Sequence, residues 1–307
     1  MSDLAEPGDR APGFAALRAL RPHQWVKNAL LLAPVFLAHR AFDEPSRLAA
    51  AGVAAVCFSL VASATYLLND WLDREADREH PSKRLRPIAS GALAPGRAAG
   101  LGAALLVAGF GLALASLPSG ATALLAAYLL LTAAYSIDLK RRVVVDVLVL
   151  AALYTLRILA GGMAADVPIS PWLLVFSMFF FLSLALVKRY AELTAAGARD
   201  QRVLPGRGYR VADRGLIPVM GLSSGFASIL IIGLWASSPD VTALYAEPTL
   251  LWLVCPVLFH WLARIWLRAH RGELDEDPVL FAATDPASYA SGALLVAIGA
   301  LAARGLA

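Results

Sequence analysis

The stretch AAAGVAAVCFSLVASATYLL, residues 49–68, runs for twenty residues without a charged side chain. A helix of about 20 apolar residues is long enough to cross the hydrocarbon core of a bilayer. The stretch that follows at once, NDWLDREADREHPSKRLRP at residues 69–87, is dense in charges of both signs. This pattern indicates a membrane span that ends either in a solvated loop or in a site that needs carboxylates and cations together.

The composition of the whole chain favours a membrane protein. Of the 307 residues, 59% are hydrophobic and 16% are charged, whereas a soluble domain carries about 25% charged residues. Cys57 and Cys255 both lie inside apolar runs, so a disulfide framework is not expected. Residues 1–14 contain three acidic side chains and no apolar segment follows them directly, which is unlike a signal peptide.

Apolar runs of this kind recur along the chain and predict an all-α fold, a polytopic helical bundle of about nine transmembrane helices. A tail over residues 1–16 is expected to precede a single transmembrane domain over residues 17–307. The expected spans are 29–39, 48–68, 98–117, 120–137, 143–164, 171–187, 215–237, 249–267 and 286–303.

The loops between these spans alternate in charge. The N-terminus and every second loop, with Arg264 at a span edge, hold 23 of the 27 Lys and Arg residues. Because cytoplasmic loops carry the excess of positive charge, we expect the N-terminus and these loops on the cytoplasmic side of a bacterial inner membrane. Any active-site cavity is expected to face the cytoplasm too.

The acidic residues that follow the span at 48–68 have helical spacing. Asp70, Asp73 and Asp77 lie at positions i, i+3 and i+7, with Asn69 one turn before Asp73. Carboxylates on one stripe repel each other unless a cation lies between them. Because the side chains offer oxygen and no sulfur, a hard ion such as Mg²⁺ suits them, completed by water and substrate phosphates.

Three cationic residues come next, at Lys83, Arg84 and Arg86. A metal ion flanked by Lys and Arg is what a diphosphate needs, because the metal neutralises part of its charge and the side chains bind the remaining oxygens. The spacing alone leaves an alternative of equal weight, a juxtamembrane helix end with ordinary solvated charges.

NDWLDREADREHPSKRLRPIASG resembles the first signature of the UbiA superfamily of intramembrane prenyltransferases, N-D-x-x-D-x-x-x-D followed by R-P-x-x-x-G. The stretches RPHQWVKN (21–28), YSIDLKRRVVVDVLVLAALYTLRILAGG (135–162) and KRYAEL (188–193) resemble one branch, the decaprenyl-phosphate phosphoribosyltransferases of actinobacterial cell-wall arabinan synthesis. The resemblance implies a helical bundle that holds Mg²⁺ on the first acidic motif.

The chain departs from the prenyl-transferring members, in which a second D-x-x-x-D motif follows the sixth span. Only Glu192 and Asp200 occur there, after the pair Lys188 and Arg189. A phosphate-binding patch at 188–189 fits the phosphoribosyl branch better than a second metal cluster does. Tyr190 and Glu192 are candidates for the ribose hydroxyls, with an ordinary interfacial tyrosine as the alternative.

Arg157 is the one basic residue inside an expected span, where it must face a cavity or a partner because an arginine there costs about 2.5–3.5 kcal/mol on insertion scales. Asp146 lies three turns earlier on the same face and is expected to line a polar stripe with Arg157 and Tyr154. A structural arginine bonded to carbonyls of a neighbouring helix is the alternative. Matches to the branch motifs add Lys27, Tyr135 and Lys140 as substrate-binding candidates, although Lys27 also suits an interfacial anchor.

Taken with these patterns, the resemblance implies Mg²⁺-dependent transfer of 5-phosphoribosyl from phosphoribosyl diphosphate to a polyprenyl phosphate, in cell-wall arabinan precursor synthesis. Asn69, Asp70, Asp73 and Asp77 are expected to hold the metal, and Lys83, Arg84 and Arg86 to stabilise the leaving group. The alternatives are transfer of a prenyl group from a prenyl diphosphate to an aromatic or quinone precursor, and a transporter or scaffold. No nucleic-acid partner is expected, and assembly of identical chains is left open.

Overall fold

The computed structural model describes residues 12–38, 44–79, 83–274 and 277–304. It is helical, and the β-type pairing among these residues is one isolated bridge between Val203 and Arg210. The chain divides into two compact units. Unit 1 comprises Met1–Leu139 and Leu156–Pro168, and unit 2 comprises Lys140–Thr155 and Ile169–Ala307. The expectation of a single transmembrane domain over 17–307 stays a prediction.

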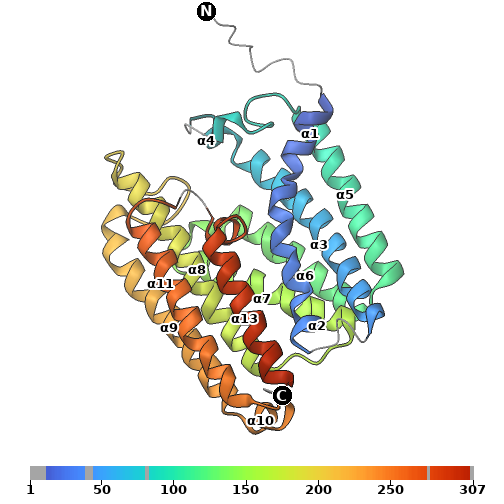
Figure 1. Cartoon of the computed structure of the whole chain (residues 1–307). Coiled ribbons are helices and arrows are strands. Elements are labelled where there is room, and N and C mark those ends of the chain that lie inside the picture. The colour runs from blue at the N-terminus through green and yellow to red at the C-terminus, as the bar shows by residue number, and fades with distance from the viewer. Residues whose placement is uncertain (1–11, 39–43, 80–82, 275–276, 305–307) are drawn as a thin grey trace, which may run out of the picture. The chain divides into compact units, whose positions relative to one another are not determined.

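Unit 1 contains the first helices of the chain (Figure 1). They are α1 (Pro12–Leu20), the 3-10 helix η1 (Pro22–Leu31), α2 (Ala33–Leu37), α3 (Pro45–Leu72), α4 (Arg74–Glu79), η2 (Lys83–Leu85), α5 (Pro95–Ser116), α6 (Ser119–Ile137) and the second half of α7 (Val145–Ala165). The long helices α3 and α5 begin with proline, which has no N–H to leave unpaired at a first turn.

Helices α3 and α5 lie side by side (Figure 1). A Cβ on Gly109 of α5 would lie 3.0 Å from a methyl of Val61 and 3.3 Å from the carbonyl oxygen of Cys57, so the absence of a side chain allows the close approach. A second close approach joins α7 to η1, where a Cβ on Gly161 would lie 2.0 Å from the carbonyl oxygen of Leu31.

Unit 2 begins in η3 (Leu139–Arg141) and contains the first half of α7. Its remaining helices are α8 (Pro171–Gly197), η4 (Val211–Gly215), α9 (Leu216–Ala236), α10 (Pro239–Leu244), η5 (Pro248–Leu253), α11 (Val254–His270), α12 (Pro278–Ala282) and α13 (Pro286–Arg304). Helix α9 packs along α8, and α11 packs against both (Figure 1). Where α9 meets its neighbours, a Cβ on Gly221 would lie 2.1 Å from the ring of Trp266.

Eight helical segments of the described chain are long and apolar enough to cross a membrane. Several carry large apolar side chains with no protein cover, such as Val107 and Leu114 of α5, which are 75% and 74% exposed. Water would penalise so many uncovered apolar side chains, whereas lipid does not. The prediction of an all-α membrane bundle is therefore confirmed, and the chain is a multi-pass membrane protein.

The expected span at 29–39 is the exception. Its described residues belong to η1 and α2, of ten and five residues, rather than to one long helix. The break before η1 has a backbone cause, because Arg21 lies in the left-handed region at φ 52° and Pro22 follows it. The first part of unit 1 is therefore a series of short helices.

Candidate functional site

The acidic stripe lies where α3 ends and α4 begins. Asp73 is the C-cap of α3, and helix-type hydrogen bonds continue across it, from the Asp73 N–H to the Asn69 carbonyl (2.9 Å) and from the Asp77 N–H to the Asp73 carbonyl (2.8 Å). The register of the stripe is therefore kept through the junction. Asp70 and Asp77 are buried, at 1% and 4% exposed, and Asn69 and Asp73 are half-buried.

Arg86 joins the two buried carboxylates. Its Nη1 atom lies 3.2 Å from Oδ1 of Asp70 and 2.7 Å from Oδ2 of Asp77. Burial raises the pKa of Asp77, and the Arg86 guanidinium opposes that shift. The residue expected to bind a leaving group therefore lies between two of the expected metal ligands.

Arg21 completes this cluster, and sequence reasoning did not select it. Its Nη2 atom donates to Oδ1 of Asp70 over 2.5 Å, and its guanidinium lies 5.3 Å from the ring centroid of Tyr66. A left-handed backbone at a residue with a side chain costs about 1–3 kcal/mol and persists where the surroundings require it. The signal was present in the sequence, because Arg21 opens the RPHQWVKN stretch.

The loop after α4 holds Arg86 in place. The Ser90 N–H donates to the Arg86 carbonyl (2.9 Å), and the Leu93 N–H donates to the Pro87 carbonyl (2.8 Å). Gly91 has a φ of +81°, a conformation that favours glycine at this turn. Buried Ile88 and Leu93 pack with residues of α1, α3 and α5 and so anchor the loop. Lys83 is half-buried and Arg84 is exposed.

The cluster suits a small hard cation, although it is not a complete set of metal ligands. Among the described residues, no three His, Cys, Asp or Glu side chains are placed to hold a metal ion together. Asp70 and Asp77 nevertheless converge on one cationic nitrogen. Mg²⁺ typically binds one or two carboxylates and completes its shell with water and phosphate oxygens. These two carboxylates therefore fit it.

Arg157 lies in a second buried cluster of unit 1. Its Nε donates to Oδ1 of Asn28 (2.8 Å), and its Nη2 donates to the hydroxyl of Tyr128 (3.0 Å). The guanidinium also lies 4.7 Å from the Tyr128 ring centroid, and Asn28 donates in turn to Ser59 (2.9 Å). These two partners are side chains from η1 and α6.

Asp146 and Arg189 form a fully buried ion pair in unit 2. Nη2 of Arg189 lies 2.6 Å from Oδ2 of Asp146, and both side chains are 0% exposed. Nη1 of Arg189 also contacts the carboxylate of Glu192. Asp146 therefore pairs within unit 2, whereas the structure places the side chain of Arg157 in the buried cluster of unit 1. Tyr154 stacks on Phe181 with the ring centroids 4.6 Å apart.

Tyr209 holds this ion pair at the start of α7. Its hydroxyl donates to Oδ1 of Asp146 (2.7 Å) and accepts from the backbone N–H of Val144 (2.9 Å), while Arg189 lies 5.4 Å from its ring centroid. Val144 is β-branched yet has a φ of 68°, which is strained for such a residue. Gly208 fits beside it because a Cβ there would lie 2.3 Å from the carbonyl oxygen of Arg141.

The remaining candidate residues do not form a common cluster with the residues described above. Lys188 lies 3.6 Å from Oδ2 of Asp277, and the Tyr190 hydroxyl is hydrogen-bonded to Nδ1 of His270 (2.9 Å). Lys140 is buried, and Lys27 and Tyr135 are half-buried. The structure thus brings together Asp70, Asp77 and Arg86 in unit 1, and Asp146, Arg189 and Glu192 in unit 2.

Curated relatives match most of this chain. Protein y4nM of Sinorhizobium fredii is 43% identical over 91% of this chain and 54% of its own length, so the chain spans about half of it. Nodulation protein NoeC of Azorhizobium caulinodans is 36% identical over 91% of this chain and 90% of its own. A decaprenyl-phosphate phosphoribosyltransferase of Mycolicibacterium smegmatis is 36% identical over 78% of this chain and 76% of its own length.

A solved structure supports the same fold. The UbiA homolog from Archaeoglobus fulgidus bound to GPP and Mg²⁺ superposes with a TM-score of 0.68, over 95% of this chain and 100% of that one. At 15% sequence identity this likeness shows the fold alone. The model of the UbiA prenyltransferase family matches residues 29–281. The chain therefore belongs to the UbiA prenyltransferase family, whose members are membrane enzymes.

Proposed function

We propose that this protein transfers 5-phosphoribosyl from phosphoribosyl diphosphate to a polyprenyl phosphate and releases diphosphate. The observation that carries the proposal is the convergence of Asp70, Asp77 and Arg86, because it combines a pair of carboxylates for a metal with a cation for a diphosphate. Relatives named decaprenyl-phosphate phosphoribosyltransferase support this donor, at 36% identity in one case and 38% in another.

The acidic cluster would hold Mg²⁺ through Asp70 and Asp77, with Asn69 and Asp73 beside them. Bound there, the ion would neutralise part of the charge of the diphosphate. Arg86 already lies against both carboxylates. Arg86, together with Lys83 and Arg84, would bind oxygens of the leaving diphosphate through charge-assisted hydrogen bonds. The acceptor phosphate is already an anion, so the reaction needs no strong general base, and catalysis rests on positioning and charge stabilisation.

The carboxylates of unit 2 favour the phosphoribosyl donor over a prenyl donor. Glu192 follows α8's cationic pair, where prenyl-transferring members carry a second acidic motif, but here it contacts buried Arg189. Asp146 is committed to the same arginine. Two carboxylates that neutralise a buried guanidinium are poorly placed to hold a second metal ion. Roles in phosphate binding for Lys27, Lys140, Lys188 and Arg189, and in ribose binding for Tyr190, remain predictions.

The proposal places the acidic cluster on the cytoplasmic side of the bacterial inner membrane. The support is the distribution of Lys and Arg over alternate loops, by the positive-inside rule. An Arg97→Cys variant tests this, since Arg97 is exposed at the start of α5. A membrane-impermeant maleimide should label it in inside-out vesicles and not in intact spheroplasts. Labelling in spheroplasts would contradict the orientation.

The activity is tested with purified protein, Mg²⁺, phosphoribosyl diphosphate and polyprenyl phosphate. Release of diphosphate together with a new lipid-linked sugar phosphate is the expected result. An Asp73→Asn variant should lose activity and change the Mg²⁺ dependence, and unchanged values in both would contradict the metal assignment.

Prenyl transfer is the second candidate, because the family is named for it and the solved homolog was captured with GPP. A prenyl diphosphate with an aromatic acid acceptor is therefore supplied in a parallel reaction. Product in that reaction, and none with phosphoribosyl diphosphate, would replace the first proposal with the second.

A further inference from the structure

Helix α11 carries a line of basic side chains at its C-terminal end. His260, Arg264, Arg268 and Arg271 follow one another at steps of four, four and three residues, so they lie along one face. The first three belong to α11, and Arg271 is its C-cap. A cavity of about 280 Å³ lies along this face, and its lining includes all four of these residues together with Leu267 and Glu273.

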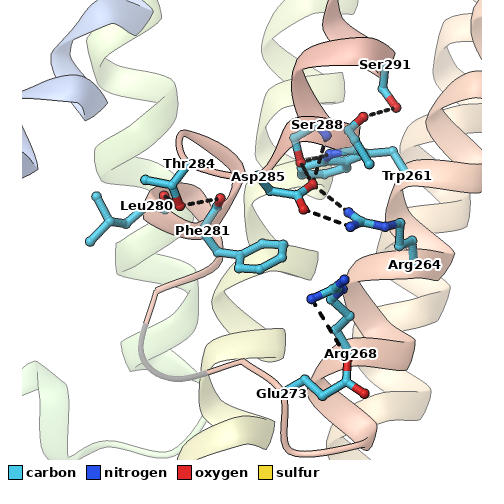
Figure 2. A network of polar contacts seen from close by, with 11 residues as sticks. Trp261, Arg264, Arg268, Glu273, Leu280, Phe281, Thr284, Asp285, Ser288 and Ser291 are labelled. Carbon is cyan, nitrogen blue, oxygen red and sulfur yellow. Dashed lines mark hydrogen bonds and ion pairs between the residues drawn. The ribbon is translucent and has the colours of Figure 1, made fainter.

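Arg264 lines this cavity, and its side chain is held in place by an ion pair. Its Nη1 and Nη2 atoms donate to the two carboxylate oxygens of Asp285 over 2.6 and 2.8 Å, as Figure 2 shows. Asp285 also accepts from the backbone N–H and the hydroxyl of Ser288, each over 2.8 Å. The charge of Arg264 is therefore neutralised by Asp285, the residue just before α13, and Arg264 shapes the cavity without supplying free charge.

Arg268 and Arg271 make fewer and weaker polar contacts than Arg264 does. Arg268 lies 3.9 Å from a carboxylate oxygen of Glu273 and 5.4 Å from the ring centroid of Phe281, and Figure 2 shows these three side chains. An ion pair of this length between partly exposed side chains contributes little. Arg271 is exposed, and its guanidinium has no hydrogen bond or ion pair with the described residues. Two guanidinium groups thus face one cavity with donors to spare.

The cavity lies where an apolar helix leaves the membrane. The candidate span Pro248–His270 ends within it, and exposed Leu267 and Phe259 continue the apolar surface toward the middle of the span. This depth is where lipid phosphates lie, and arginine side chains reach toward that level from helix ends. A ligand with a phosphate head and an apolar tail matches both halves of the surface.

We propose that this cavity binds the phosphate headgroup of an anionic membrane phospholipid, with Arg268 and Arg271 as its ligands. Arginine binds phosphate oxygens through paired, charge-assisted hydrogen bonds, which distinguishes this cavity from a merely basic surface. The acyl chains lie against Leu267 and the apolar face of α11. Glu273 is exposed and moves away from Arg268 when the phosphate takes its place.

Native mass spectrometry of the purified full chain in detergent tests the proposal, with phosphatidylglycerol and phosphatidylcholine as the two probes. The wild-type protein is expected to retain phosphatidylglycerol preferentially. The variant Arg268→Gln/Arg271→Gln is expected to lose about tenfold in that preference, as two charge-assisted contacts imply. Arg97→Gln/Arg199→Gln is the matched control, because it removes two charges from exposed positions that do not line the cavity.

Two results would overturn the assignment. One is an equal loss of preference in the cavity variant and in the charge-matched control, which indicates general electrostatic attraction. The other is full displacement of phosphatidylglycerol by millimolar inorganic phosphate, which indicates a site for a free anion rather than a lipid. A thermal unfolding curve of each variant, expected to overlay that of the wild type, ensures that a lost lipid reports binding and not misfolding.

Discussion

Nη2 of Arg21 lies 2.5 Å from Oδ1 of Asp70, and Arg21 makes this contact from a left-handed backbone. The two residues are 49 positions apart. The contact links the end of the short helix α1 to the end of α3, where the metal-binding carboxylates are proposed. A backbone strain retained beside a buried carboxylate indicates that Arg21 positions Asp70.

Replacing Arg21 by Gln should therefore lower the transfer rate by about 10- to 100-fold, as removing a residue that orients a metal ligand generally does. The Mg²⁺ concentration for half-maximal rate should rise as well. Arg18→Gln, one turn earlier on α1, is the control, because Arg18 is exposed and its hydrogen bond within the described part of the chain goes to the Leu85 carbonyl over 3.4 Å. Equal Mg²⁺ requirements in both variants would show that Arg21 acts on the fold alone.

The Asp146–Arg189 pair allows a structural role to be separated from a substrate role. Asp146→Asn leaves a fully buried guanidinium partly uncompensated and should lower the free energy of unfolding by about 3–5 kcal/mol. The double variant Asp146→Leu/Arg189→Leu should lower the free energy of unfolding by less than Asp146→Asn does, because both charges are removed together. Chemical denaturation in detergent measures both. If Arg189 serves mainly as a phosphate ligand, Arg189→Leu will instead raise KM for the substrate while stability stays near that of the wild type.

Gly161→Ala should prevent normal packing in unit 1. The added Cβ would lie 2.0 Å from the carbonyl oxygen of Leu31, and a backbone atom moves aside only if η1 or α7 shifts. We expect a loss of at least about 4 kcal/mol, or no folded protein in detergent extracts. Gly100→Ala in α5 is the matched control, because nothing lies within 4 Å of its Cβ position. Alanine there should stabilise the helix by up to about 1 kcal/mol.

The Arg264–Asp285 pair should make stability depend on pH in the acid range. Hydrogen bonds from Arg264 lower the pKa of Asp285, against the opposing effect of burial, so the folded protein holds the carboxylate ionised below the pKa of about 3.9 found in unfolded chains. The contribution of Asp285 is therefore complete above that value and is lost as pH falls through the folded pKa. Thermal unfolding from pH 7 to pH 3 should show a shallower decline for Asp285→Asn than for the wild type. If the unfolding temperatures of the wild type and of Asp285→Asn fall in parallel, ionisation of Asp285 does not contribute to the pH dependence of stability.

The membrane spans could be predicted from the sequence because each depends on the apolar character of a whole run of residues and not on any single contact. A run such as residues 49–68 needs no tertiary information to be recognised as a span, since length and lack of charge decide the matter. The span at 29–39 failed for a local reason. The segment is divided at Leu32, between the 3-10 helix η1 and the α-helix α2, and hydropathy does not detect such a change of backbone conformation.

The sequence predicted which site residues share a face of one helix, but it did not predict contacts between residues of different helices. Helical spacing placed Asp70 and Asp77 on one face, and both are buried there. The contacts of Arg21, Tyr209 and Tyr128 join residues distant in sequence, and spacing carries no information on such pairs. Arg189 shows the same limit, because its position beside a lysine at the end of a helix does not reveal its contacts with Asp146 and Glu192.

Tyr209 uses both capacities of its hydroxyl, donating to Asp146 and accepting from the Val144 N–H. Burial raises the pKa of this phenol, and its hydrogen bond to Asp146 raises it further. The proton therefore stays on the oxygen throughout the pH range in which a cell lives. The contact that fixes the first turn of α7 is therefore insensitive to pH across the physiological range.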